Sequence, residues 1–417
     1  MDRRGACVCF AAAVLTGCGG SQSPSGAPGL GPITSETVIY SFAGGNDGAV
    51  PAAAPIVVNG AFYGTTVLGG NGGCVVVHGC GTVYAVNSSA QERVLHVFTS
   101  VPDGEAPGSL IESGGNLLGT TTYGGDAACK STNTTGCGTI FEASPSGSES
   151  VLYSFAGNAG GAAPNSLTPF NGTIYGEAAA GGAGQCYYAD LPGCGLIFEM
   201  NASGTVTTLY TFAGGKGGGS PQGGLLPFGG NLYGTTSVGG GDACNNSGGC
   251  GTVFEMTPSG SVTVLHGFGD SRRDGAIPAT GLVALDGDFY GSTLSGGNSD
   301  CAYSGSGFGC GTIFEIAPSG KEKVLYNFTG GNDGEAPNGL IVVDGNLYGT
   351  TAGRGAHLCG TLFKLTPAGL LTTLYQFRGG SDGCGPGSAL VDVNGTLYGT
   401  TTGGGAYGHG TLYGIPP

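Results

Sequence analysis

The sequence predicts an all-β fold, a seven-bladed β-propeller of four-stranded antiparallel blades. Three observations support it: one sequence unit recurs every 50 to 58 residues, seven copies fill the chain to its end, and the composition suits short strands joined by turns. Glycine contributes 92 of 417 residues and charged residues only 9%. Apolar runs rich in β-branched and aromatic residues recur between clusters of Gly, Pro, Asn and Asp, which excludes disorder.

Three short pieces mark each copy of the repeat. Tyr-Gly-Thr, or a variant of it, begins at Tyr63, Leu118, Tyr175, Tyr233, Tyr290, Tyr348 and Tyr398. Cys-Gly begins at Cys80, Cys137, Cys194, Cys250, Cys310 and Cys359, with His409-Gly410 in the last copy. A phenylalanine ends each copy at Phe42, Phe98, Phe155, Phe212, Phe268, Phe328 and Phe377. The shared period indicates one structural unit per copy.

Each copy divides into four strands. In the sixth copy we expect them at 339–343, 346–351, 360–365 and 371–377. Four-stranded antiparallel sheets repeated at this period stack as the blades of a propeller, which buries both faces of every sheet.

The two ends of the repeat region complement each other. The chain enters at 37–42 with a strand of the fourth type, and the last copy supplies only three strands, at 389–393, 396–401 and 410–415. We therefore expect the N-terminal strand to complete the last blade and to close the ring, which removes an open sheet edge. The propeller domain is assigned to residues 36–417.

The first residues predict export with a lipid anchor. Arg3 and Arg4 precede a short apolar run that ends at Leu15-Thr16-Gly17-Cys18, which resembles a bacterial lipobox. The prediction is a signal peptide at 1–17, lipidation at Cys18, and a flexible Gly/Ser/Pro tether over 18–35. The expected location is the cell envelope, at the outer membrane or cell surface. The alternative is an ordinary signal peptide that contains an incidental cysteine.

Charge and cysteine content restrict the partners and the compartment. A net charge of −15, with 12 Lys+Arg against 27 Asp+Glu, provides no basic stripe for nucleic acid, so the membrane is reached through the lipid alone. Fifteen cysteines are typical of an oxidising compartment.

Twelve of the cysteines fall into six expected disulfides. Five pairs are local to a second-turn loop: Cys74 with Cys80, Cys129 with Cys137, Cys186 with Cys194, Cys244 with Cys250, and Cys301 with Cys310. The remaining Cys359 and Cys384 lie in neighbouring blades on the same face, so a disulfide between blades is expected. Free thiols or a metal site are the alternative.

Three pieces of the repeat together resemble a known family. They are Val-Leu-Tyr-Ser-Phe at 151–155, Gly-Asn-Leu-Tyr-Gly-Thr-Thr at 230–236 and Gly-Thr-Ile-Phe-Glu at 138–142. On these pieces the chain is similar, over about residues 36–417, to the bacterial choice-of-anchor proteins with tandem GloVer (Gloeobacter/Verrucomicrobia-type) repeats. The resemblance implies repeat architecture and a surface anchor, and it brings no accepted activity. The strand order also resembles kelch propellers, although the kelch Trp is absent.

One face of the propeller is expected to carry the long loops. The first and third turns of each copy are minimal, whereas second turns such as 237–249 and crossovers such as 213–223 are long. We predict that this long-loop face binds a glycan or another protein without catalysis. The candidate binding residues are Tyr123, Tyr187, Tyr188, Tyr303, Phe308 and Tyr407, which could stack on sugars, together with Arg354 and Arg378. A monomer is expected.

One alternative assigns a catalytic site to the same face. His78, His357 and His409 lie in or beside the second turns of blades one, six and seven, and they could form the centre of a lyase or hydrolase acting on extracellular polymer. Coincidence on exposed loops is the simpler interpretation. His96 and His266 occupy the position of a repeat Tyr and are interpreted as structural replacements.

The crossovers repeat Gly-x-Asp-Gly-x-x-Pro, and its aspartates are candidate calcium ligands. Asp47, Asp333 and Asp382 would each supply one carboxylate per loop, which falls short of the six to eight oxygens that calcium takes. We therefore interpret the aspartates as turn residues and predict no cofactor.

Overall fold

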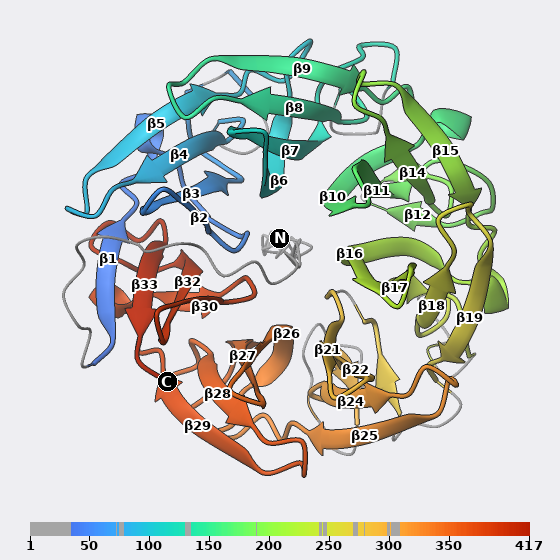
Figure 1. The fold of residues 1–417 in the computed structure, drawn as a ribbon. Coiled ribbons are helices and arrows are strands. Elements are labelled where there is room, and N and C mark those ends of the chain that lie inside the picture. The colour runs from blue at the N-terminus through green and yellow to red at the C-terminus, as the bar shows by residue number, and fades with distance from the viewer. Residues whose placement is uncertain are drawn as a thin grey trace, which may run out of the picture.

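Seven antiparallel sheets stand around a common axis in the computed structural model of the chain (Figure 1). The structure describes residues 35–417 except 72, 75–78, 130–134, 189, 242–243, 245–247, 270–273, 279, 298–300 and 302–308. The predicted seven-bladed propeller is confirmed. Within the described residues there is no α-helix, and no helix that could cross a membrane.

The four strands of each blade follow one another from the central axis outward (Figure 1). Blades 1 and 2 comprise β2 (Ile56–Val58), β3 (Ala61–Thr66), β4 (Thr82–Val86) and β5 (Glu92–Val97), then β6 (Glu105–Ser113), β7 (Asn116–Tyr123), β8 (Thr139–Ala143) and β9 (Glu149–Ser154). Blades 3 and 4 comprise β10 (Ala162–Phe170), β11 (Thr173–Ala180), β14 (Leu196–Met200) and β15 (Val206–Thr211), then β16 (Gly219–Phe228), β17 (Asn231–Val238), β18 (Thr252–Met256) and β19 (Val262–Gly267). Blades 5 and 6 comprise β21 (Val283–Leu285), β22 (Asp288–Thr293), β24 (Thr312–Ile316) and β25 (Glu322–Asn327), then β26 (Glu335–Val343), β27 (Asn346–Gly353), β28 (Thr361–Leu365) and β29 (Leu371–Gln376).

Blade 7 is assembled from both ends of the repeat region. Its inner part is β30 (Cys384–Pro386) and β31 (Val391–Val393), followed by β32 (Thr396–Gly403) and β33 (Thr411–Ile415). The outer strand is β1 (Thr37–Ser41), which pairs antiparallel with β33 and lies beside it in Figure 1. The predicted closure of the ring by the N-terminal strand is therefore confirmed.

Small elements outside the blades lie in the connections. Two short hairpin pairs are formed by β12 (Tyr187–Tyr188) with β13 (Leu191–Pro192), and by β20 (Gly275–Ala276) with β23 (Ser295–Gly296). Single 3-10 turns lie in crossovers at η1 (Gly45–Asp47), η2 (Asn158–Gly160), η3 (Gly215–Gly217) and η5 (Gly380–Asp382).

The inner strands differ from the expected boundaries. Strand β26 begins at Glu335 rather than at 339, because pairing with β27 continues past Pro337 through a shift of register before Leu340. A proline lacks the N–H that the ladder needs, and an irregularity in the pairing accommodates it. In blades 5 and 7 the segment equivalent to the start of β26 forms a separate short strand, β20 or β30. In blade 1 it is reduced to an isolated bridge between Ala49 and Leu68.

The repeated phenylalanines hold neighbouring blades together. All seven are fully buried. Phe98 of blade 1, for example, contacts the ring of Phe141 of blade 2 edge to face, with ring centroids 5.0 Å apart. The glycine of each Tyr-Gly-Thr piece lies against the third-strand ring: a β-carbon at Gly119 would collide with Phe141. Each copy of the repeat therefore has Phe and Gly at these positions, because two aromatic rings and the backbone of a strand pack closely together between the blades.

The repeated threonines pair inside each blade. In blade 2 the Oγ1 atoms of Thr121 and Thr139 lie 2.9 Å apart. The same pair recurs in five other blades, as Thr66 with Thr82, Thr236 with Thr252, Thr293 with Thr312, Thr351 with Thr361, and Thr401 with Thr411. The threonine one position earlier bonds to the next blade: Thr65 Oγ1 donates to the carbonyl of Gly108 at 2.6 Å. Glu177 takes that place in blade 3 and is fully buried.

Candidate functional site

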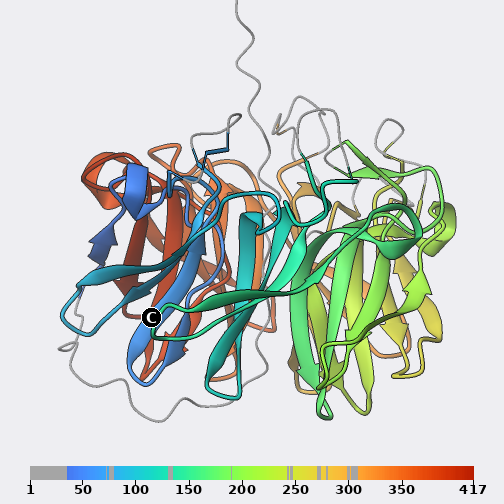
Figure 2. The ribbon, with the colours of Figure 1, turned by 90° about the horizontal axis from the view of Figure 1, so that it is seen from above.

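The long connections share one face of the ring. Tight first turns, such as the one between β6 and β7 (teal), lie at the lower face in Figure 2. Because successive strands of a blade are antiparallel, the second turns and the crossovers lead to the opposite face. The sequence analysis places any binding site on this long-loop face.

All six expected disulfides are present on this face. The five local bonds join residues six to nine positions apart: Cys74–Cys80, Cys129–Cys137, Cys186–Cys194, Cys244–Cys250 and Cys301–Cys310. The sixth, Cys359–Cys384, links the second turn of blade 6 to the inner strand of blade 7 across a Cα–Cα distance of 4.5 Å. Six disulfides indicate an oxidising, extracytoplasmic environment. They also stiffen loops that have little core of their own.

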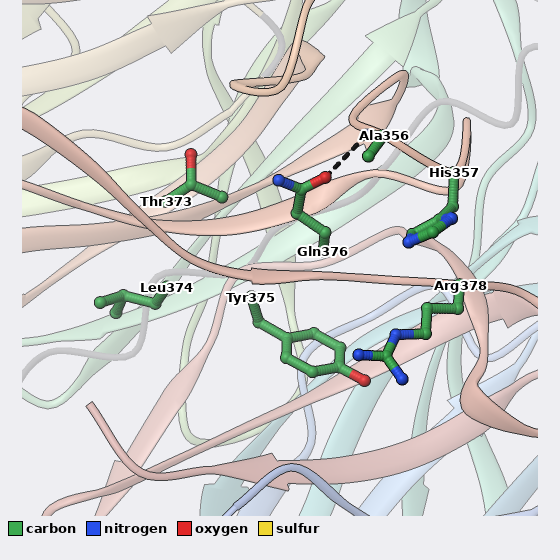
Figure 3. Close-up of a pocket in the computed structure, with 7 residues that line it drawn as sticks. All are labelled: Ala356, His357, Thr373, Leu374, Tyr375, Gln376 and Arg378. Atoms are coloured by element: carbon green, nitrogen blue, oxygen red, sulfur yellow. Dashed lines mark hydrogen bonds between the residues drawn. The ribbon is translucent and has the colours of Figure 1, made fainter.

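A shallow recess of about 390 Å³ lies at the rim of blade 6, between the 354–358 turn and the outer strand β29. Ala356, His357, Thr373, Leu374, Tyr375, Gln376 and Arg378 line it (Figure 3). The N–H of Ala356 donates to Gln376 Oε1 at 2.7 Å, which ties the turn to the strand. The recess thus offers an imidazole, a guanidinium and a fixed amide in a strongly acidic protein.

The three histidines of the predicted catalytic alternative are not brought together by any described contact. His357 lines the blade 6 recess. His409 is exposed in blade 7, where its ring lies over Gly44. His78 lies outside the described residues. The recess does unite His357 with Arg378, one of the predicted binding residues.

The predicted aromatic residues do not line a common groove. Tyr123 and Tyr188 pack on the core between blades 2 and 3. Tyr187 and Tyr407 are 72% and 64% exposed, but they belong to blades 3 and 7. Tyr303 and Phe308 lie outside the described residues.

Arg354 has a structural partner. Its Nε atom lies 3.2 Å from Oε2 of the buried Glu335, at the start of the inner strand of the same blade. Truncating Arg354 would leave this buried carboxylate without its cation, so a variant at Arg354 is unsuitable as a probe of binding. Arg378 is the better probe.

The three aspartates of the calcium alternative serve their own crossovers. The carboxylate of Asp333 accepts the N–H of Thr329 at 2.8 Å and the hydroxyl of Tyr326 at 3.0 Å. The carboxylates of Asp47 and Asp382 accept a tyrosine hydroxyl and a backbone N–H in the same way. The three lie in three separate crossovers, and their oxygens are engaged by turn hydrogen bonds.

The structure also shows clusters between blades that the sequence analysis missed. We call the boundary between the outer strands of two neighbouring blades a seam. At four seams, the ring near the end of one outer strand meets the crossover aspartate and a glutamate at or just before the start of the next outer strand. The four sets are Tyr40–Asp47–Glu92, His96–Asp103–Glu149, His266–Asp274–Glu322 and Tyr375–Asp382–Glu36. The sequence signal that could have revealed these clusters is a glutamate four positions before the ring residue of the next copy, as Glu92 stands before His96.

Comparison with known proteins decides the family. The model of the Gloeobacter/Verrucomicrobia repeat matches residues 30–244, 127–302 and 245–417. The chain belongs to the Gloeobacter/Verrucomicrobia repeat family. No curated protein matches it.

Three solved structures show a distant resemblance to this Gloeobacter/Verrucomicrobia repeat protein. A chain of a nidogen/laminin complex is 12% identical with a TM-score of 0.42, covering 72% of this chain and 91% of that one. A putative 6-phosphogluconolactonase from Bacteroides uniformis is 16% identical with a TM-score of 0.46, covering 76% and 84%. The computationally designed Ika8 protein is 13% identical with a TM-score of 0.44, covering 91% and 99%. These values are too low to transfer an activity.

The seams of this repeat protein hold carboxyl groups with raised pKa values. Burial, followed by the neighbouring Asp382, raises the pKa of Glu36 to about 7. Burial and Asp47 raise the pKa of Glu92 to about 8. Each glutamate therefore keeps a substantial protonated fraction near neutral pH and can share its proton with the aspartate beside it.

Stability should fall as the pH rises from 6 to 9. The folded-state pKa values of Glu36 and Glu92 lie above the value of 4.5 for the unfolded chain, so their stabilisation is complete below about pH 4.5. It is lost progressively as the pH rises to about 7 for Glu36 and about 8 for Glu92, and the range from pH 6 to 9 covers the last part of this loss. Allowing for solvent screening, we expect a loss of about 1–2 kcal/mol per seam and a fall in Tm of about 3–5 °C. Thermal unfolding at both pH values measures this.

A matched pair of variants identifies the groups responsible. Glu36→Gln/Glu92→Gln should weaken the dependence of Tm on pH, whereas the exposed Glu112→Gln should retain it in full. The part that remains in the double variant belongs to other groups such as Glu177 and Glu322, because burial raises the pKa of each of these two carboxyl groups to about 7 as well. A wild-type Tm that rises over this range would show that the seam carboxyls are ionised in the folded protein.

Proposed function

We propose that this repeat protein is a lipid-anchored component of the cell envelope whose propeller binds a glycan or another protein with its long-loop face, without catalysis. The anchor rests on the lipobox that ends at Cys18, which lies outside the described residues. The six disulfides support an extracytoplasmic location.

The blade 6 recess is the observation that carries the binding proposal. It combines His357 and Arg378 at the rim of a disulfide-stiffened face, and Cys359 of the inter-blade disulfide lies in the same turn as His357. A rigid turn lowers the entropic cost of binding. The guanidinium and the imidazole favour a ligand with carboxylate or sulfate groups, and the open, shallow shape suits a polymer more than a small enclosed substrate.

Arg378→Ala/His357→Ala should weaken polysaccharide binding at least tenfold. Loss of a charge-assisted hydrogen bond costs about 1.5–3 kcal/mol, which is about a tenfold to hundredfold change in affinity. Affinity electrophoresis in gels containing polygalacturonate, alginate or neutral laminarin measures it, and we expect retardation by the two acidic polymers.

Arg93→Ala is the matched control for this experiment. It removes the same charge from the tight-turn face, where Arg93 donates to the backbone carbonyls of Pro145 and Ser146. Retardation should be unaffected in this variant. Equal retardation of the Arg378→Ala/His357→Ala variant, or no retardation in any of the three gels, would contradict glycan binding at the recess.

A further inference from the structure

Two of the four seam clusters contain a histidine in place of the tyrosine. In the first, His96 Nε2 lies 3.1 Å from Asp103 Oδ2 and 3.8 Å from Glu149 Oε2. In the second, His266 Nε2 lies 3.5 Å from Asp274 Oδ2. Within each set, one ligand atom from each residue lies within 4.8 Å of the others. Metal ligands about 2.1 Å from a tetrahedral ion lie about 3.4 Å from one another, and the observed distances fall around that value.

The chemistry of the set suits a divalent transition metal. One neutral imidazole and two carboxylates carry a charge of −2, which a divalent cation neutralises. The nitrogen ligand and the small number of protein ligands favour Zn²⁺ over Ca²⁺, which prefers six to eight oxygens. A fourth position would be left for water.

Burial makes the carboxylates costly without a cation. The side chains of His96, Asp103 and Glu149 are 21%, 14% and 9% exposed. Asp103 Oδ1 and Glu149 Oε1 are buried without a hydrogen-bond partner among the described residues. The N–H of Thr99 donates to Asp103 Oδ2 at 2.9 Å, which fixes the orientation of this ligand as second-sphere bonds do in metal sites.

The tyrosine seams show what the histidine changes. Tyr375 donates its hydroxyl to Asp382 at 2.6 Å and lies 3.4 Å from Glu36. A protonated phenol is a hydrogen-bond donor to the carboxylate, whereas a neutral imidazole can present a lone pair to a cation. The fold therefore accepts either ring at the same position, and only the imidazole completes a ligand set.

We propose that His96, Asp103 and Glu149, and likewise His266, Asp274 and Glu322, each bind one Zn²⁺ ion, which joins blade 1 to blade 2 and blade 4 to blade 5. Each ion would connect the outer strand and crossover of one blade to the outer strand of the next. The sites are separate from the blade 6 recess and independent of its ligand.

Zinc content and thermal stability of the tag-free protein test the proposal. After equilibration with Zn²⁺ and removal of free ion, elemental analysis should find one ion per triad in the wild type. His96→Tyr should lose one ion and His96→Tyr/His266→Tyr should lose both. Tyrosine is the matched replacement, because the other five outer strands carry it at this position. Zn²⁺ should raise the Tm of the wild type and leave that of the double variant unchanged.

Gain of a site provides an independent arm. Tyr375→His should add one bound ion, because Asp382 and Glu36 are already in place. Tyr326→His should add none, because Leu371 starts the next outer strand where the triads have a glutamate.

The outcomes separate a metal site from a simple ion pair. Equal zinc content in the wild type and in the His96→Tyr/His266→Tyr variant would overturn the proposal, and any zinc common to both would then belong to other groups such as His357 or His409. A wild type without retained zinc would mean that each imidazole is only the protonated partner of its two carboxylates, and would overturn it as well. Loss of both ions in the double variant, with a zinc-independent Tm, supports it.

Discussion

Deletion of residues 1–42 should lower the free energy of unfolding by more than about 5 kcal/mol and should cause the remaining chain to associate. The deletion removes β1, the outer strand of blade 7, and Phe42, which is fully buried against Tyr84 of blade 1 with ring centroids 4.9 Å apart. A buried Phe→Ala change alone costs about 3–5 kcal/mol. The deletion also exposes the edge of β33, and an unpaired strand edge is a template for association with another chain.

Denaturant unfolding and light scattering measure the two effects. Deletion of residues 1–34, which retains β1, should change neither the unfolding midpoint nor the association state of the chain. Phe42→Ala and Phe212→Ala in the full chain should lose similar stability, because both rings are fully buried between blades. Equal midpoints for the two truncated proteins would show that blade packing alone keeps the ring closed.

Cys359→Ala/Cys384→Ala should be the most destabilising loss of a single disulfide. This bond closes 25 residues, whereas Cys244–Cys250 closes six. On the chain-entropy model the two losses are about 3.5 and about 2 kcal/mol. The larger loop also connects blade 6 to blade 7, the blade that the N-terminal strand completes.

The comparison with Cys244→Ala/Cys250→Ala is the control. Cys244, Cys250 and Cys359 are buried and Cys384 is partly buried, so the two double variants lose similar packing and a difference between them reports mainly the cross-link. Unfolding of both variants in denaturant, in the absence of reductant, measures it. If the two losses were equal, the restraint between blades 6 and 7 would contribute nothing beyond loop closure within a blade.

The architecture follows from the sequence because every copy of the repeat solves the same packing problem. Phe98 and Gly119 recur in equivalent positions because an aromatic ring from one blade packs against the next blade, whose third-strand ring lies over the glycine. The order of strand types at the two ends predicts the closure of blade 7. Six disulfides follow from cysteine spacing and from the face on which each turn emerges.

The candidate sites could be predicted from the sequence only in part. His357 and Arg378 were identified as separate candidates, and the structure places both in one recess. Of the three predicted catalytic histidines, His357 and His409 are not joined by any described contact, because equivalent loops of neighbouring blades are spread around a ring, and His78 lies outside the described residues. The predicted set of sugar-stacking aromatic residues is also divided by the structure. Tyr123 and Tyr188 pack on the core, whereas Tyr407 faces the solvent.

The seam triads were recognised only in the tertiary structure. His96 aligns with a tyrosine in other copies, so the sequence classifies it as a replacement within its own strand. Its partner Glu149 begins the outer strand of the following blade, and only the stacking of blades brings it within 3.8 Å. Periodicity determines the number, order and closure of the blades because those contacts repeat. Which side chains meet across a seam is decided by the angle and distance between blades, so the spacing of a glutamate and a ring in the sequence can be interpreted only when the blades are stacked.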